Sequence, residues 1–136
     1  MDPFIDDAKG LVFAAIVVQL VFTVIGLIGL AIVGIFLSIP FYSAPSPSTT
    51  NVPILFSGIL IAGAIAVVGF GLVWLFLDYF LIYRVLEKGR AKDASTVTLV
   101  LGIIQLMTDL IPGILLILAY TKIQDSIKME LYSRAK

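Results

Sequence analysis

Two aspartates set within apolar sequence are the residues of this chain best placed to do chemistry. Asp78 ends a stretch without charged residues that begins after Lys9. Asp109 lies in MTDLIPG (residues 107–113), in the middle of the apolar stretch 96–120. An ionisable side chain is costly inside a membrane and is by default a functional hypothesis there. The sequence therefore indicates a possible intramembrane polar site at Asp78 and Asp109.

Several kinds of chemistry are disfavoured by residue type. The chain has no cysteine and no histidine, which removes thiol nucleophiles and the usual ligands of zinc, copper and haem. The two aspartates are expected near opposite membrane surfaces, too far apart to act as a carboxylate pair. Zero net charge without a dense basic run argues against a nucleic-acid partner. We predict no enzyme, no catalytic residue, no metal and no cofactor.

The elements that position these residues are predicted from the apolar blocks. Hydrophobic residues make up 60% of the 136 residues and charged residues 13%, so lipid is the expected solvent. Blocks 11–39 and 54–77 each exceed the ~20 residues that cross a bilayer as a helix. We predict an all-α polytopic membrane bundle, a single domain spanning 1–136, with helices at about 3–39, 54–84, 94–109 and 112–132. Asp2 is expected to cap the first helix, with Pro3 at its first position.

The third apolar block decides the topology. Lysine and arginine mark cytoplasmic loops, so the basic connection 84–95 is expected inside, with both termini, and the charge-free loop 40–53 outside the cell membrane. The basic tail returns to the inside only if the chain turns back, and Pro112 and Gly113 suit a turn. We predict two long transmembrane helices plus a shorter C-terminal helical hairpin. Three spans with a Pro-kinked third are the alternative.

The charged connection and the two aspartates carry local predictions. Gly89 is expected to end a helix, and Asp93 or Ser95 to cap the next one. Asp78 is expected to pair with a basic residue such as Lys122, and Asp109 to cap the hairpin.

Small and polar residues at helical spacing predict packing faces. One face of the second span carries Gly58, Ala62, Ala66 and Gly69; a similar face of the first carries Ala15, Gln19, Thr23 and Gly26. Small residues let two helix backbones approach closely in lipid. The simplest interpretation is packing within one subunit, and the alternative is a contact between subunits.

The C-terminal sequence LGIIQL…IPGILLILAYTKI (residues 101–123) resembles small uncharacterised multi-helix membrane proteins common in archaea. The resemblance rests on apolar residues and implies no functional residue. Two functions are open. The first is a structural or interaction protein: an accessory subunit of a membrane complex, or a repeated membrane or envelope unit, as in an archaeal virus. The second is a small oligomeric ion channel or transporter, with Gln19, Thr23 and Asp78 along its path. The expected partners are the lipid bilayer and other membrane subunits or further copies of the chain.

Overall fold

The computed structural model describes residues 2–43 and 52–135, and the regular elements within them are all helices. They are α1 (Pro3–Ser43), α2 (Val52–Leu77), the π-helical segment η1 (Asp78–Tyr83), α3 (Arg84–Glu87), α4 (Ala91–Thr108) and α5 (Leu110–Arg134). Among the described residues, three helical stretches are long and apolar enough to cross a membrane: Pro3–Ile39, Leu55–Glu87 and Leu110–Arg134. The predicted all-α membrane bundle is therefore confirmed.

The chain forms two compact units. The first contains Met1–Leu20 and Val73–Lys136, and the second contains Val21–Leu72. The first unit holds the buried core, which α1, α2, η1, α3, α4 and α5 all contribute to. Its fully buried members include Val12 of α1, Ile82 of η1 and Leu116 of α5.

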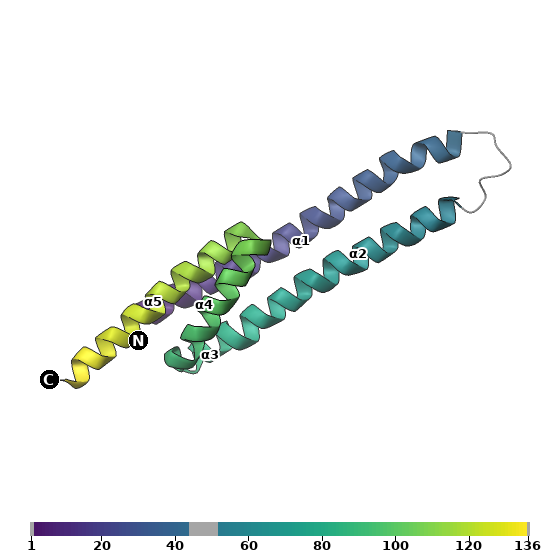
Figure 1. Cartoon of the computed structure of the whole chain (residues 1–136). Coiled ribbons are helices and arrows are strands. Elements are labelled where there is room, and N and C mark those ends of the chain that lie inside the picture. The colour runs from purple at the N-terminus through teal and green to yellow at the C-terminus, as the bar shows by residue number, and fades with distance from the viewer. Residues whose placement is uncertain (1, 44–51, 136) are drawn as a thin grey trace. The chain divides into compact units, whose positions relative to one another are not determined.

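The C-terminal hairpin lies in the first unit. Helices α4 and α5 run back along each other (Figure 1) and approach closely at two glycines. A Cβ added at Gly102 would lie 3.2 Å from Leu116 Cβ. A Cβ added at Gly113 would overlap the backbone of Leu106. The chain turns back, so the alternative of a single Pro-kinked third span is wrong.

The reversal occurs at Asp109, three residues before the predicted Pro112. Asp109 has an extended backbone (φ −139°, ψ 95°) between the two helices. Pro112 and Gly113 are instead buried in the first turn of α5. Proline is tolerated there because the first N–H groups of a helix have no intrahelical acceptor. Gly113 serves the close approach of the two helices rather than the turn.

A π-helical segment keeps one face of the helical stretch from Trp74 to Leu86 buried. Trp74, Asp78, Ile82 and Leu86 recur every four residues, and each is at most 7% exposed. An α-helix has 3.6 residues per turn, so a spacing of four drifts around its axis. The wider π turn closes a bond from the Arg84 N–H to the Tyr79 carbonyl and takes up this drift.

The connection to α4 is a glycine-dependent helix stop. Gly89 has φ +71°; its N–H donates to the Leu86 carbonyl, and the Arg90 N–H donates to the Val85 carbonyl. These are the two bonds of a Schellman motif, so the predicted role of Gly89 is confirmed. The predicted caps of α4 are wrong, because that helix begins earlier, at Ala91.

Both chain ends of the first unit lie together. Asp2 Oδ1 accepts a hydrogen bond of 3.0 Å from the Phe4 N–H, which confirms the predicted cap. Asp2 also accepts a bond from the Ser126 hydroxyl of α5. Asp7 of α1 pairs with Lys122 of α5 at 3.2 Å. The N- and C-terminal segments are thus tied to each other (Figure 1).

The second unit is an antiparallel pair formed by the remainder of α1 and most of α2. A Cβ added at Gly26 would lie 3.4 Å from Val67 Cγ1, and one at Gly63 would lie 3.5 Å from Leu30. Gly71 faces Thr23 so closely that an added Cβ would overlap its hydroxyl. Small residues on α1 and α2 therefore face larger side chains on the opposite helix.

Candidate intramembrane polar site

Asp78 is fully buried in the first unit and bound by a carboxamide. Gln105 Nε2 of α4 lies 2.8 Å from both carboxylate oxygens and donates to them. Both side chains are 0% exposed. The other polar atom of the amide, Gln105 Oε1, is buried and has no hydrogen-bond partner among the described residues. The predicted pairing of Asp78 with Lys122 is wrong, because Lys122 binds Asp7.

Asp109 has a carboxamide partner of its own. Gln19 Nε2 of α1 donates to Asp109 Oδ2 at 3.1 Å, and Gln19 is only 3% exposed. Asp109 occupies the residue before α5, but its side chain makes no capping hydrogen bond to that helix. The carboxylate therefore ties the hairpin tip to α1 instead of capping α5 as predicted.

The two acid–amide pairs are adjacent along α4. Gln105 and Asp109 are four residues apart, and the Asp109 N–H donates to the Gln105 carbonyl at 2.5 Å. Each carboxylate is bound by a different glutamine. Because Gln105, which binds Asp78, lies only one helical turn from Asp109, the expectation that the two acids lie near opposite membrane surfaces is wrong. The arrangement offers oxygen acceptors and amide donors, which suit holding a cation or a proton more than attacking a bond.

Gln105 is the site residue that the sequence prediction omitted. It is a polar residue within the apolar C-terminal block, and that polarity could have singled it out, although nothing in the local spacing points to Asp78 as its partner. A buried glutamine needs hydrogen-bond partners, and a nearby carboxylate is a suitable acceptor.

The predicted packing residues of α1 all lie against neighbours within their own units. Ala15 is buried in the core of the first unit, and Gln19 binds Asp109. Thr23 and Gly26 face α2 in the second unit, against Gly71 and Val67.

The predicted small-residue face of α2 lies exposed. Gly58, Ala62, Ala66 and Gly69 are exposed in the single chain. A Cβ added at Gly58 or at Gly69 would meet no atom of the described chain within 4 Å. Within the second unit, α2 meets α1 through Leu60, Gly63, Val67 and Gly71. At 100° per residue, these two faces of α2 lie roughly 150° apart.

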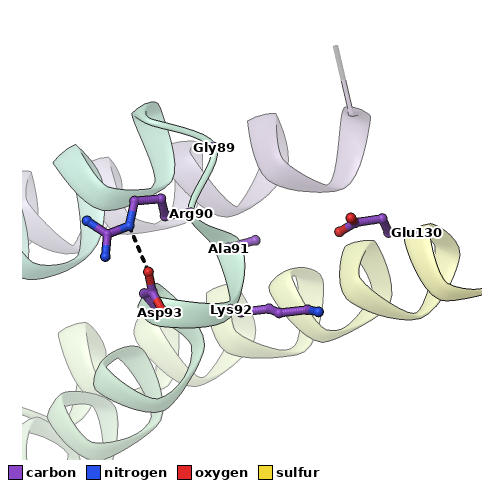
Figure 2. A pocket seen from close by; sticks show the side chains of 6 residues that line it. All are labelled: Gly89, Arg90, Ala91, Lys92, Asp93 and Glu130. Atoms are coloured by element: carbon purple, nitrogen blue, oxygen red, sulfur yellow. Dashed lines mark hydrogen bonds and ion pairs between the residues drawn. The ribbon is translucent and has the colours of Figure 1, made fainter.

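A charged recess lies at the start of α4, away from the buried acids. It is lined by Gly89, Arg90, Ala91, Lys92, Asp93 and, from α5, Glu130. Figure 2 shows Arg90 directed at Asp93, to which its Nε donates at 2.7 Å. Both side chains are more than half exposed, so this pair contributes little to stability. The contact drawn among its described lining residues is this ion pair.

The chain was compared with known protein families, curated proteins and solved structures. No family model, curated protein or solved structure matches the chain. Among the described residues, no three acidic side chains come together in a way that could hold a metal ion.

Proposed function

We propose that this chain is a non-enzymatic membrane protein that works by packing against other subunits. It would be an accessory subunit of a membrane complex or a repeated membrane or envelope unit. One observation carries the proposal: the small-residue face of α2, at Gly58, Ala62, Ala66 and Gly69, is open in the single chain. Small faces allow the close backbone contact through which helices associate in lipid.

The position of this face supports an intermolecular role. The opposite side of α2 already contacts α1 within the second unit, so the small face is left for a further helix. An apolar recess lined by Ala64, Ile65, Val68 and Gly69 adjoins it. A neighbouring helix could place a side chain in this recess while its backbone runs along the glycines and alanines.

The test is to extract the protein from its native membranes in mild detergent and determine what it is assembled with. The proposal expects a stable complex with further copies or with another membrane protein. Reconstituted into liposomes, the same material is expected to conduct no ions. A protein that remains monomeric in bilayers and co-purifies with nothing would contradict the proposal.

A small oligomeric channel or transporter is the second candidate, favoured by the buried polar pairs of the first unit. Asp78 with Gln105 and Asp109 with Gln19 are polar groups within otherwise apolar helices, and such groups often mark ion pathways. Ion flux in liposomes that is lost in Asp78→Asn, with the fold intact, would favour this function over the first.

A further inference from the structure

The carboxylate of Asp78 is buried, and no positive charge among the described residues compensates it. Buried charges in proteins are normally paired with an opposite charge or bound to a cation. Gln105 supplies hydrogen bonds to Asp78 but no charge. The described cations of the surrounding helices have other contacts or lie exposed. Lys122 binds Asp7, Lys9 binds Asp6, and Arg84 lies over the Phe80 ring.

The other titratable side chains on the described helices around Asp78 do not supply a counter-charge to its carboxylate. The acid nearest to Gln105 along the chain is Asp109, which follows α4 and is bound by Gln19. The others lie on or just before α1 (Asp2, Asp6, Asp7, Lys9), on η1 and α3 (Tyr79, Tyr83, Arg84, Glu87), around α4 (Lys88, Arg90, Lys92, Asp93) and on α5 (Tyr120, Lys122, Asp125, Lys128, Glu130, Tyr132, Arg134). None of these forms an ion pair with Asp78 in the described chain.

The side-chain amide of Gln105, which binds Asp78, also has one polar atom without a hydrogen-bond partner in the described chain. Gln105 Oε1 is buried and accepts no hydrogen bond from the described residues. Leaving a buried acceptor unsatisfied costs about 1–3 kcal/mol. One added positive charge between the two side chains would neutralise the carboxylate and also supply Oε1 with a partner.

We propose that Asp78 and Gln105 form a binding site for one small monovalent cation, either H⁺ or Na⁺. A protonated carboxyl gains an O–H donor, which Gln105 Oε1 accepts while Gln105 Nε2–H donates back to the other carboxyl oxygen. Na⁺ would instead be held between a carboxylate oxygen and the amide oxygen, after the carboxamide turns over. Both ligands use the same pair of acceptors.

The backbone around Asp78 supports a built site. Asp78 is the first residue of the π-helical segment, and π turns inside helices occur frequently at functional sites. Trp74 and Ile82, one turn on either side, are buried and keep the site within the apolar core. The proposal goes beyond the proposed function, since a packing subunit and a transporter could each contain such a site.

The experiment measures unfolding of the purified full-length chain by SDS in mixed micelles. In one arm the pH is varied with choline as the only salt cation. In the other, NaCl replaces choline chloride at fixed pH and ionic strength. Asp78→Asn is the test variant, and Asp93→Asn is the matched control, because it removes an exposed carboxylate already paired with Arg90.

For H⁺, the folded state binds more protons than the unfolded state. The unfolding equilibrium constant should then rise with pH, by at most about tenfold per unit. For Na⁺, the constant should fall as the Na⁺ concentration rises. Either response should disappear in Asp78→Asn and persist in Asp93→Asn. A wild type that responds in neither arm, or an Asp78→Asn variant that responds like the wild type, would overturn the site.

An infrared measurement on the wild type keeps the proposal testable if Asp78→Asn does not fold. A proton site predicts a carboxylic-acid C=O absorption at neutral pH without Na⁺, which shifts in Gln105→Met. A Na⁺ site predicts a shift of the carboxylate bands when Na⁺ is added. A spectrum with neither feature would count against both forms of the proposal.

Discussion

Gly113 of α5 lies directly against the backbone of Leu106 in α4. A Cβ added at Gly113 would also come within 2.8 Å of the Gln105 carbonyl carbon. These atoms belong to the α4 backbone and cannot rotate away as a flexible side chain could. The contact therefore fixes the spacing between α4, which carries Gln105, and α5, which begins directly after Asp109.

Gly113→Ala should destabilise the protein, because the methyl group must push two packed helices apart. Overpacking of this kind costs typically 1–3 kcal/mol, more than the ~1 kcal/mol that alanine gains over glycine inside a helix. The measurement is the free energy of unfolding by SDS. Gly10→Ala is the matched control, since its added methyl meets nothing within 4 Å and should be neutral or stabilising. Equal effects at the two positions would contradict the close packing.

Gly89→Ala should also destabilise the protein, for a reason confined to the backbone. A Cβ at Gly89 would have open space, but its φ of +71° is unfavourable for residues with a side chain. The expected cost is roughly 1 kcal/mol. Gly89→Asn should lose less than Gly89→Ala, because asparagine tolerates this conformation better. The order of the two variants in thermal unfolding checks the prediction, and the reverse order would contradict it.

Gln105→Leu should cost more than Gln124→Leu. The first change leaves the buried carboxylate of Asp78 without its amide donor, at about 1–3 kcal/mol. Gln124 donates to the Ser95 hydroxyl in a partly buried contact, where water can replace the lost bond. The unfolding free energies of the two variants, measured under the same conditions, test this order. An equal or smaller loss in Gln105→Leu would contradict it.

The hairpin was predictable from the sequence because the distribution of charge and the local chemistry agreed. The basic residues around Lys92 and those of the tail reach the same side only if the chain turns back. The exact point of reversal was not predictable in this way. Pro112 suits both a turn and the first turn of a helix, and only the close packing of Gly113 distinguishes them.

The partners of the buried acids were less accessible to sequence reasoning. Opposite charge favours Lys122 as a partner of Asp78, but Lys122 lies with Asp7 near the chain ends. The choice of Gln105 depends on how α4 packs against η1. The π-helical segment, which keeps Asp78 on the same face as Trp74 and Ile82, has no clear sequence signature. Geometry of this kind arises from packing and not from local propensity.

Gly58→Leu and Ala62→Leu should weaken assembly while leaving the single chain folded. Both positions are exposed, so a larger side chain can be accommodated in the monomer but would separate two helices packed on this face. Ile61→Leu is the control, because it keeps the side-chain volume on another side of α2. Cross-linking in liposomes, with thermal stability in detergent as the folding control, measures the effect. Equal cross-linking in all three variants would contradict the interface.

The depth of the hairpin tip leads to the last prediction. Asp109 is bound to Gln19, which follows Lys9, the last charged residue of α1, by ten positions. Ten residues of helix rise ~15 Å, about half of the ~30 Å hydrocarbon core. The tip should therefore lie deep in the membrane and not at the outer headgroups. The chain would enter and leave on one side, with the polar tip shielded by α1.

Single cysteines introduced into this cysteine-free chain can test the topology in oriented vesicles. Lys92→Cys and Ser133→Cys are exposed positions and should react with a membrane-impermeant thiol reagent from the same, cytoplasmic side. Ser46→Cys, which lies outside the described residues, should react from the opposite side. Thr108→Cys, beside the tip, should resist the reagent from both sides and react only after solubilisation. Labelling of Thr108→Cys together with Ser46→Cys would show instead that the hairpin reaches the far surface. Labelling of Ser133→Cys from that side would rule out a common side for the tail and the basic connection.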